Sequence, residues 1–125
     1  MTDKERLRQE FKSRIYRYVL RLVTFLDFLP KKPVIREIIS QLIRSGTSIG
    51  ANYFEAYAAS SKKDYQNFFN HSLKSANETI FWLAVLRDSH LVPVDVEKDC
   101  EWLLQETREL AKIFASSIIT MKGKK

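Results

Sequence analysis

The sequence is poor in residues that interrupt regular structure, and poor in cysteine. Its 125 residues include only three glycines and three prolines, which predicts long regular segments joined by short connections. The single cysteine, Cys100, excludes an intramolecular disulfide and predicts a cytoplasmic protein in which this thiol is a small buried side chain. No apolar run approaches the ~18 residues that a membrane helix needs, so we expect no membrane segment.

The residue patterns of common catalytic and cofactor sites are also missing. The two histidines, His71 and His90, belong to no pair with metal-ligand spacing, and no Glu-x-x-His is present. The glycines of the stretch RSGTSIGAN, residues 44–52, do not fit a phosphate-binding loop, because no Lys-Ser or Lys-Thr follows them. They do not form a dinucleotide-binding fingerprint either. We therefore expect no enzyme activity, no cofactor and no bound metal.

Four segments carry apolar residues at spacings of three and four, which is the period of an amphipathic helix. The predicted helices span about 4–29, 33–59, 62–90 and 94–121. Pro30 and Pro33 separate the first two, and Ser61 with Asp64 has the form of a capping box before the third. No stretch alternates like a strand. The prediction is a single all-α domain, an antiparallel up-down-up-down four-helix bundle.

The apolar stripes include many aromatic residues. The stripe of the first helix starts at Leu7, which we therefore expect in the core. In the second and third helices the stripe includes the aromatic residues Tyr53, Tyr57 and Tyr65. Aromatic rings can stack on nucleobases. At core spacing their usual role is to fill space, so we expect these rings in the core.

Within the second helix, RSGTSIGAN is unusual because each helical glycine costs up to about 1 kcal/mol relative to alanine. Its two glycines are four residues apart and small residues flank them. On a helix, residues at these spacings share one flank, which lowers the profile of the helix and lets another backbone approach closely. The predicted close-packing residues are Ser45, Gly46, Ser48, Gly50 and Ala51.

The formal net charge is +6, and the whole excess lies in the first third of the chain. Residues 1–44 hold 11 Lys or Arg and 5 Asp or Glu, whereas the remaining residues hold equal numbers of each sign. Such asymmetry is typical of a surface that meets a polyanion, and the alternative is an ordinary solvated basic face. The predicted nucleic-acid contacts are Arg14, Arg17 and Arg21, then Lys12, Arg8, Lys31, Lys32 and Arg44.

The first helix also has a second apolar face. Tyr16, Leu20 and Val23 lie roughly opposite its core stripe, which predicts an oligomer interface; scattered surface exposure is the alternative. The three arginines lie beside this face, so assembly would multiply their charge. The alternative role for the arginines is ion pairing with acids of the fourth helix, such as Glu101, Glu106 and Glu109.

Two blocks of the sequence resemble a known family, the 23S rRNA-intervening-sequence proteins, also called the S23 or four-helix-bundle family. The first block is QLIRSGTSIGAN at 41–52 followed by Glu55-Ala56, and the second is SKKDY at 61–65 with ET at 78–79 and WL at 82–83. The resemblance covers about residues 7–120 and implies a bundle assembled into a ring-like homopentamer without known catalysis. A related branch with a similar fold is the accessory variability proteins of diversity-generating retroelements. That branch implies a basic pentamer that binds RNA or DNA and a reverse transcriptase.

These features predict a non-enzymatic homo-oligomer that binds structured RNA or DNA, and the resemblance implies a bacterial protein. The contacts would be to phosphates, with affinity that falls with salt and with weak sequence preference. The resemblance adds a reverse transcriptase or a ribosomal RNA element as the setting. The alternative function is a protein–protein interaction scaffold whose basic face binds an acidic protein.

Overall fold

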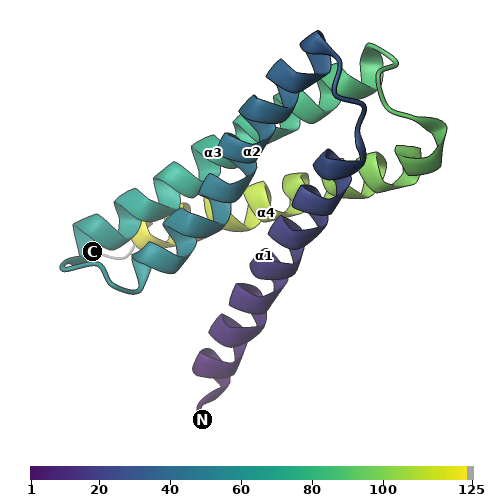
Figure 1. Ribbon diagram of the computed structural model, residues 1–125. Helices are drawn as coiled ribbons and strands as arrows, with labels where there is room; N and C mark the ends of the chain where they lie inside the picture. The colour runs from purple at the N-terminus through teal and green to yellow at the C-terminus, as the bar shows by residue number, and fades with distance from the viewer. Residues whose placement is uncertain (124–125) are drawn as a thin grey trace.

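Four α-helices make up the structure, a computed structural model that describes residues 1–123. They are α1 (Asp3–Phe28), α2 (Pro33–Ala56), α3 (Lys62–Asp88) and α4 (Glu97–Gly123), and a short 3-10 turn, η1 (Val94–Val96), precedes α4. Consecutive helices run in opposite directions and pack as neighbours, and α1 also contacts α4, which closes the bundle (Figure 1). The predicted all-α four-helix bundle is confirmed. None of the described helices is both long and apolar enough to cross a membrane.

The helices begin at residues that satisfy their free N–H groups. Thr2 caps α1 with its side-chain oxygen, and Pro33, which has no N–H, occupies the first turn of α2. Ser61 caps α3, because its Oγ accepts a hydrogen bond from the backbone N–H of Asp64 at 3.1 Å. The Asp64 carboxylate accepts from the Ser60 hydroxyl at 2.7 Å, so the second arm of the capping pattern goes to the preceding serine.

Three predicted helix boundaries were too generous. The structure ends α2 and α3 three and two residues before the predicted positions, and α4 begins three residues later than predicted. At the end of α3, His90 adopts a φ of 58°, and the N–H of Leu91 returns to the carbonyl of Leu86 at 3.1 Å. This left-handed residue turns the chain away from the helix axis, and Pro93 then precedes the 3-10 turn.

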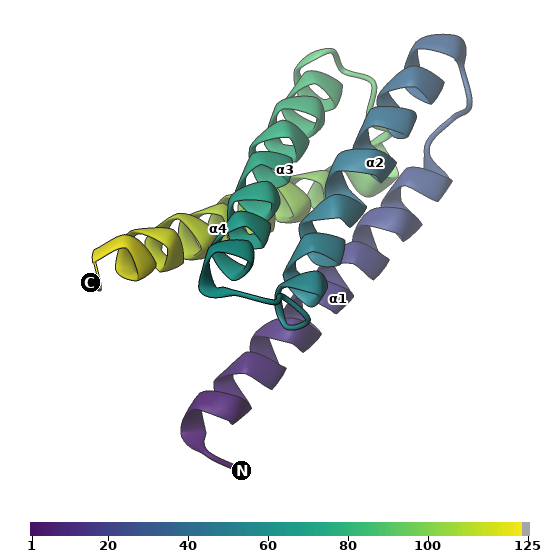
Figure 2. The ribbon, with the colours of Figure 1, turned by 90° about the vertical axis from the view of Figure 1, so that its left-hand side faces the viewer.

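The core begins well inside α1. Residues 1–10 are exposed, and the first fully buried side chain of α1 is Ile15. The prediction that Leu7 lies in the core was wrong, because its side chain is 65% exposed. Figure 2 shows the reason: the N-terminal turns of α1 extend beyond the other helices, so no helix covers them fully.

The two central glycines lie inside the continuous helix α2 and face α1. A Cβ added to Gly46 would overlap Cδ2 of Leu22, and one added to Gly50 would lie 3.3 Å from methyl groups of Ile15 and Val19. The absence of both side chains therefore lets α1 lie close against α2. The atoms that meet this flank are side-chain atoms of α1 in the same chain, and not the backbone that the sequence predicted.

The serines beside the glycines face α3 instead. Three hydroxyl groups of α3 form hydrogen bonds of 2.9 Å with α2. Ser75 donates to Ser48 Oγ, Ser72 donates to the carbonyl of Ile49, and the hydroxyl groups of Thr79 and Ser45 share the third. Small side chains let the two helices approach, and each buried hydroxyl finds a partner across the contact. The glycines thus pack against α1 and the serines against α3. Ala51, which was also predicted to pack closely, is exposed.

Candidate nucleic-acid interface

Arg14 lies on the flank of α1 that faces α4. Its Nε and Nη2 donate to the two carboxylate oxygens of Glu106 at 2.7 and 2.9 Å, and the Glu106 side chain is only 14% exposed. The hydrogen bond to Glu106 raises the pKa of the Arg14 guanidinium. Ion pairing with acids of the fourth helix was the alternative role predicted for these arginines, and Arg14 forms such a pair with Glu106. This arginine clamps α1 to α4.

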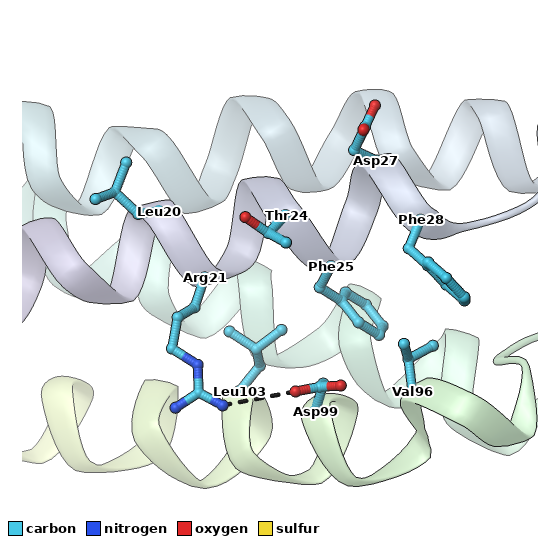
Figure 3. Close-up of a pocket in the computed structure, with 9 residues that line it drawn as sticks. All are labelled: Leu20, Arg21, Thr24, Phe25, Asp27, Phe28, Val96, Asp99 and Leu103. Carbon is cyan, nitrogen blue, oxygen red and sulfur yellow. Dashed lines mark ion pairs between the residues drawn. The ribbon is translucent and has the colours of Figure 1, made fainter.

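Arg21 lies on the same flank of α1 as Arg14, whereas Arg17 faces solvent. Its Nη2 lies 3.6 Å from Asp99 Oδ1, and its guanidinium carbon lies 3.7 Å from the centre of the Trp102 ring. A groove of about 410 Å³ surrounds this ion pair between α1 and the start of α4 (Figure 3). The groove carries Asp27 and Asp99 against the single arginine. Its net negative charge does not suit a phosphate.

Arg17 is exposed on α1. Within the described residues, no carboxylate lies within 4 Å of its guanidinium, in contrast to Arg14 and Arg21. The three leading predicted nucleic-acid contacts, Arg14, Arg17 and Arg21, therefore differ in their surroundings. Two of its arginines hold α4, and only Arg17 has its full charge available to a partner.

The predicted cations farther along the chain are also divided. Lys31 donates from Nζ to three carbonyl oxygens at the end of α1, at 2.6 to 3.3 Å, so it closes that helix without losing its charge. Lys32 is exposed immediately before α2. Arg44 pairs with Glu78 of α3 and donates to Gln41 at 2.8 Å. Among these three, only Arg44 is neutralised by a carboxylate.

Arg8 and Lys12 lie on the flank of α1 that faces α2, and each lies over an aromatic ring. The Arg8 guanidinium carbon is 5.6 Å from the centre of the Tyr57 ring, and Lys12 Nζ is 4.8 Å from the centre of the Phe54 ring. Both cations are exposed, and no carboxylate of the described chain lies within 4 Å of either. A cation held over a ring keeps its charge.

The apolar side chains predicted for an oligomer interface lie on one exposed face of α1. Tyr16, Leu20 and Val23 are 56%, 49% and 40% exposed. A shallow groove of about 200 Å³ adjoins Tyr16 and is floored by Gly50 and Ala51 of α2, with Phe54 at its edge. The oligomer itself, including its ring form, stays a prediction.

Comparisons with known proteins address the family. A family model described as 23S rRNA-intervening sequence protein matches residues 9–116. This chain belongs to that family. A crystal structure described as a protein with unknown function from the S23 ribosomal protein family, from Bacteroides thetaiotaomicron VPI-5482, is 34% identical. It superposes with a TM-score of 0.76 over 86% of this chain and 96% of that chain. No curated protein matches the chain.

Membership in the 23S rRNA-intervening sequence protein family confirms the resemblance carried by the two sequence blocks. The match extends from the second turn of α1 almost to the end of α4, so it includes both glycines and most of the predicted cations. The relation to the accessory variability proteins stays a prediction.

The sequence reasoning missed one set of contacts, the pairs formed by Arg8 with Tyr57 and by Lys12 with Phe54. The prediction that Tyr57 lies in the core was wrong, because its side chain is 40% exposed. Each pair joins residues more than 40 positions apart, so no local spacing announces it. The available signal was the position of Tyr57 near the end of the predicted second helix, because helix ends often fray; in the structure Tyr57 is the C-cap of α2.

Proposed function

We propose that this 23S rRNA-intervening sequence protein is a non-enzymatic homo-oligomer that binds structured RNA or DNA through the phosphates. The basic surface consists of the predicted cations that no carboxylate neutralises, namely Arg8, Lys12, Arg17, Lys31 and Lys32. A ribosomal RNA element or a reverse transcriptase with its RNA is the kind of machinery that such an accessory protein would serve.

The observation that carries this proposal is the uneven use of the positive charge. The excess of six positive charges lies in residues 1–44. Within residues 1–123, only Arg14, Arg21 and Arg44 of the eight predicted contacts pair with carboxylates across the bundle. A protein gains little stability from unpaired like charges on one helix, but such charges release counterions when they meet a polyanion. The surplus is therefore best explained by binding.

Assembly of several subunits supports the same function. Tyr16, Leu20 and Val23 form an exposed apolar face beside the free cations, and a face of this kind is typical of a protein contact. Burying it between subunits would bring the free cations of α1 close to a neighbouring chain. Cations that bind one phosphate each in a single chain would then form a continuous positive surface.

Binding is tested with a variant that removes only free cations, R8Q/K12Q/R17Q. We expect its affinity for a 20-base-pair duplex and for an RNA hairpin to fall, and its salt dependence to weaken. Each lost phosphate contact removes about 0.9 from the slope of log affinity against log salt on duplex DNA. Fluorescence anisotropy between 50 and 200 mM salt measures both quantities.

Two control variants separate site from charge. K74Q/K98Q/K112Q removes the same charge from exposed residues of α3 and α4, and R21Q removes an exposed arginine of α1 that pairs with Asp99. Both are expected to bind nearly as the wild type does. The proposal is rejected if the R8Q/K12Q/R17Q variant keeps the affinity and salt slope of the first control.

Assembly is tested separately by placing a charge in the apolar face. Leu20→Glu is expected to reduce the mass measured in solution by light scattering to that of a smaller species. Ile119→Glu is the matched control, because Ile119 is exposed on α4 and lies outside this face. A wild-type protein that is monomeric at micromolar concentration would refute the assembly.

The alternative function, a scaffold that binds an acidic protein, is favoured by one observation. Leu7 and Phe54 are exposed close to the free cations, and a phosphate backbone has no need of apolar neighbours. A partner protein that is captured from cells after nuclease treatment, by a wild-type chain that shows no RNA or DNA binding at physiological salt, would establish this alternative.

A further inference from the structure

A groove lies between the N-terminal half of α1, the end of α2 and its connection to α3, the start of α3 and the C-terminal half of α4. It has a volume of about 480 Å³ and is widely open to solvent, as a site for a segment of a longer chain must be. All four helices or their ends contribute to its wall. We call it the terminal groove, and its residues used below are Lys4, Arg8, Tyr57 and Tyr65.

The aromatic wall of the terminal groove is held rigidly from behind. Tyr53 is buried, and its hydroxyl and that of Tyr57 share a hydrogen bond of 2.6 Å. The ring of Tyr65 lies edge-on to Tyr57 with ring centres 6.0 Å apart, and it lies 4.8 Å from the ring of Phe69. Because these neighbours fix the rings, little conformational entropy is lost when a flat ligand stacks on them.

The tyrosines stay neutral at physiological pH. Burial raises the pKa of Tyr57 and of Tyr65 to about 12. Their hydroxyl groups therefore carry no charge that would repel an anion. Tyr57 is 40% exposed and Tyr65 is half-buried, so both present ring surface to the groove.

Among the residues that the structure describes, the charge of the terminal groove is positive. Lys4 and Arg8 are the charged lining residues of this part of the chain, and no acid of it lines the groove. A smaller groove on the other side of Arg8 and Tyr57 includes Lys12 and one acid, Glu5. Within the described chain, neither Lys4 nor Arg8 has a carboxylate within 4 Å. Stacking rings beside free cations are the two components of sites for single-stranded nucleic acid.

We propose that the terminal groove binds an unpaired nucleotide of a single-stranded RNA or DNA segment. The base stacks on the face of one tyrosine ring, Tyr57 or Tyr65, and its edge meets the other ring, because the two ring planes are inclined at 74°. The flanking phosphates contact Lys4 and Arg8. This inference rests on the proposed nucleic-acid binding and adds a substrate class to it. A base-paired duplex offers its phosphates to the cations but keeps its base faces stacked inside, so it leaves the aromatic wall unused.

The experiment compares a single strand with a duplex. The probes are 12-nucleotide oligo(U) and oligo(dT), which distinguish RNA from DNA, and a blunt 12-base-pair duplex. The variant Y57L/Y65L removes both rings, and Y57F/Y65F keeps the rings and removes the hydroxyls. We expect Y57L/Y65L to bind the single strands at least about tenfold more weakly, since stacking accounts for about tenfold or more per base. Y57F/Y65F should bind them nearly as the wild type does, and duplex binding should stay the same in all three proteins.

The outcomes separate this inference from the proposed function. A wild-type chain that binds the duplex as tightly as the single strands, or a Y57L/Y65L variant that keeps its single-strand affinity, overturns the terminal groove as a nucleotide site and leaves phosphate binding standing. A wild-type chain that binds none of the probes overturns both. A chain that binds an acidic peptide through the same tyrosines, and no oligonucleotide, identifies the groove as a protein site and overturns the inference.

A second measurement does not depend on the folding of variants. Oligo(U) that carries 5-iodouridine cross-links on irradiation to aromatic side chains stacked on the base. We expect the cross-linked peptide of the wild-type protein to contain Tyr57 or Tyr65. Cross-links confined to other aromatic residues, such as the exposed Phe81, would contradict the inference.

Discussion

Replacing Gly46 by alanine is expected to destabilise the protein, although alanine is the better helix former. Gly46 is buried in the middle of α2, and a Cβ at this position would overlap Cδ2 of Leu22 on α1. Leu22 is itself fully buried, so its side chain has little room to turn away. The substitution therefore forces α1 and α2 apart or strains the leucine.

The magnitude follows from two opposing effects. Alanine in place of a helical glycine contributes about 1 kcal/mol, whereas overpacking a buried contact costs about 1 to 3 kcal/mol. Because the overlap at Gly46 is severe, we expect Gly46→Ala to lose about 1 kcal/mol of unfolding free energy. At Gly50 the nearest methyl groups lie at 3.3 Å and one belongs to half-buried Val19, so helix propensity wins there. We expect Gly50→Ala to gain about 0.5 kcal/mol.

The assay is urea unfolding followed by circular dichroism, at one fixed protein concentration because assembly changes apparent stability. A double-mutant cycle with Leu22→Ala isolates the contact. Leu22→Ala alone is expected to cost about 2 to 5 kcal/mol. In that background the leucine methyl groups are gone, so Gly46→Ala should change sign and stabilise the protein by up to about 1 kcal/mol.

One result would refute this reasoning. If Gly46→Ala stabilises the protein by about 1 kcal/mol whether or not Leu22 is present, α1 does not lie close against α2 at Gly46. The same pair of measurements would then remove the physical explanation for the two glycines.

Two further predictions concern a helix cap and the buried thiol. Ser61→Ala removes the oxygen that caps α3 and should lower the free energy of unfolding by about 1 kcal/mol. Ser60→Ala removes only an exposed hydrogen bond to Asp64 and should change it by less than about 0.5 kcal/mol. Equal losses of the two variants in urea unfolding would contradict the assignment of Ser61 as the cap. Burial raises the pKa of the Cys100 thiol from 9.0 to about 11, so the folded state favours the neutral thiol. Its contribution to stability is complete below pH 9 and is lost as the pH rises from 9 through 11, by an amount on the order of 2 kcal/mol. Cys100→Ala should therefore lose less stability than the wild type between pH 8 and pH 11, and parallel losses in the two proteins would contradict this role of the thiol.

Much of the fold follows from local patterns. The apolar spacing of three and four, the prolines at 30 and 33 and the cap at Ser61 all act within one or two turns of the chain, and the structure has helices at those places. Where the pattern failed, the cause was not local. Leu7 continues the stripe of α1, but it is exposed because the other helices do not extend far enough to cover it.

The candidate site could be predicted only in outline. The excess of positive charge in residues 1–44 is visible in the sequence, whereas the fate of each cation is not. Arg14 and Arg17 are three residues apart on one helix, yet Arg14 meets Glu106 of α4 and Arg17 meets solvent. Which arginine pairs with an acid depends on the rotation of α1 about its axis and on its shift along α4. Neither quantity can be predicted from the residue spacing within either helix.

Sequence alone determined that this chain is four amphipathic helices with a low-profile flank at Gly46 and Gly50 and a positive first third, because these properties belong to single residues and single turns. The packing of the helices decided which cations stay free, which small residues face α1 and which face α3, and that Arg8, Tyr57 and Tyr65 share one groove. Those relations join residues tens of positions apart, and they arise only when burial of the apolar stripes sets the register between helices.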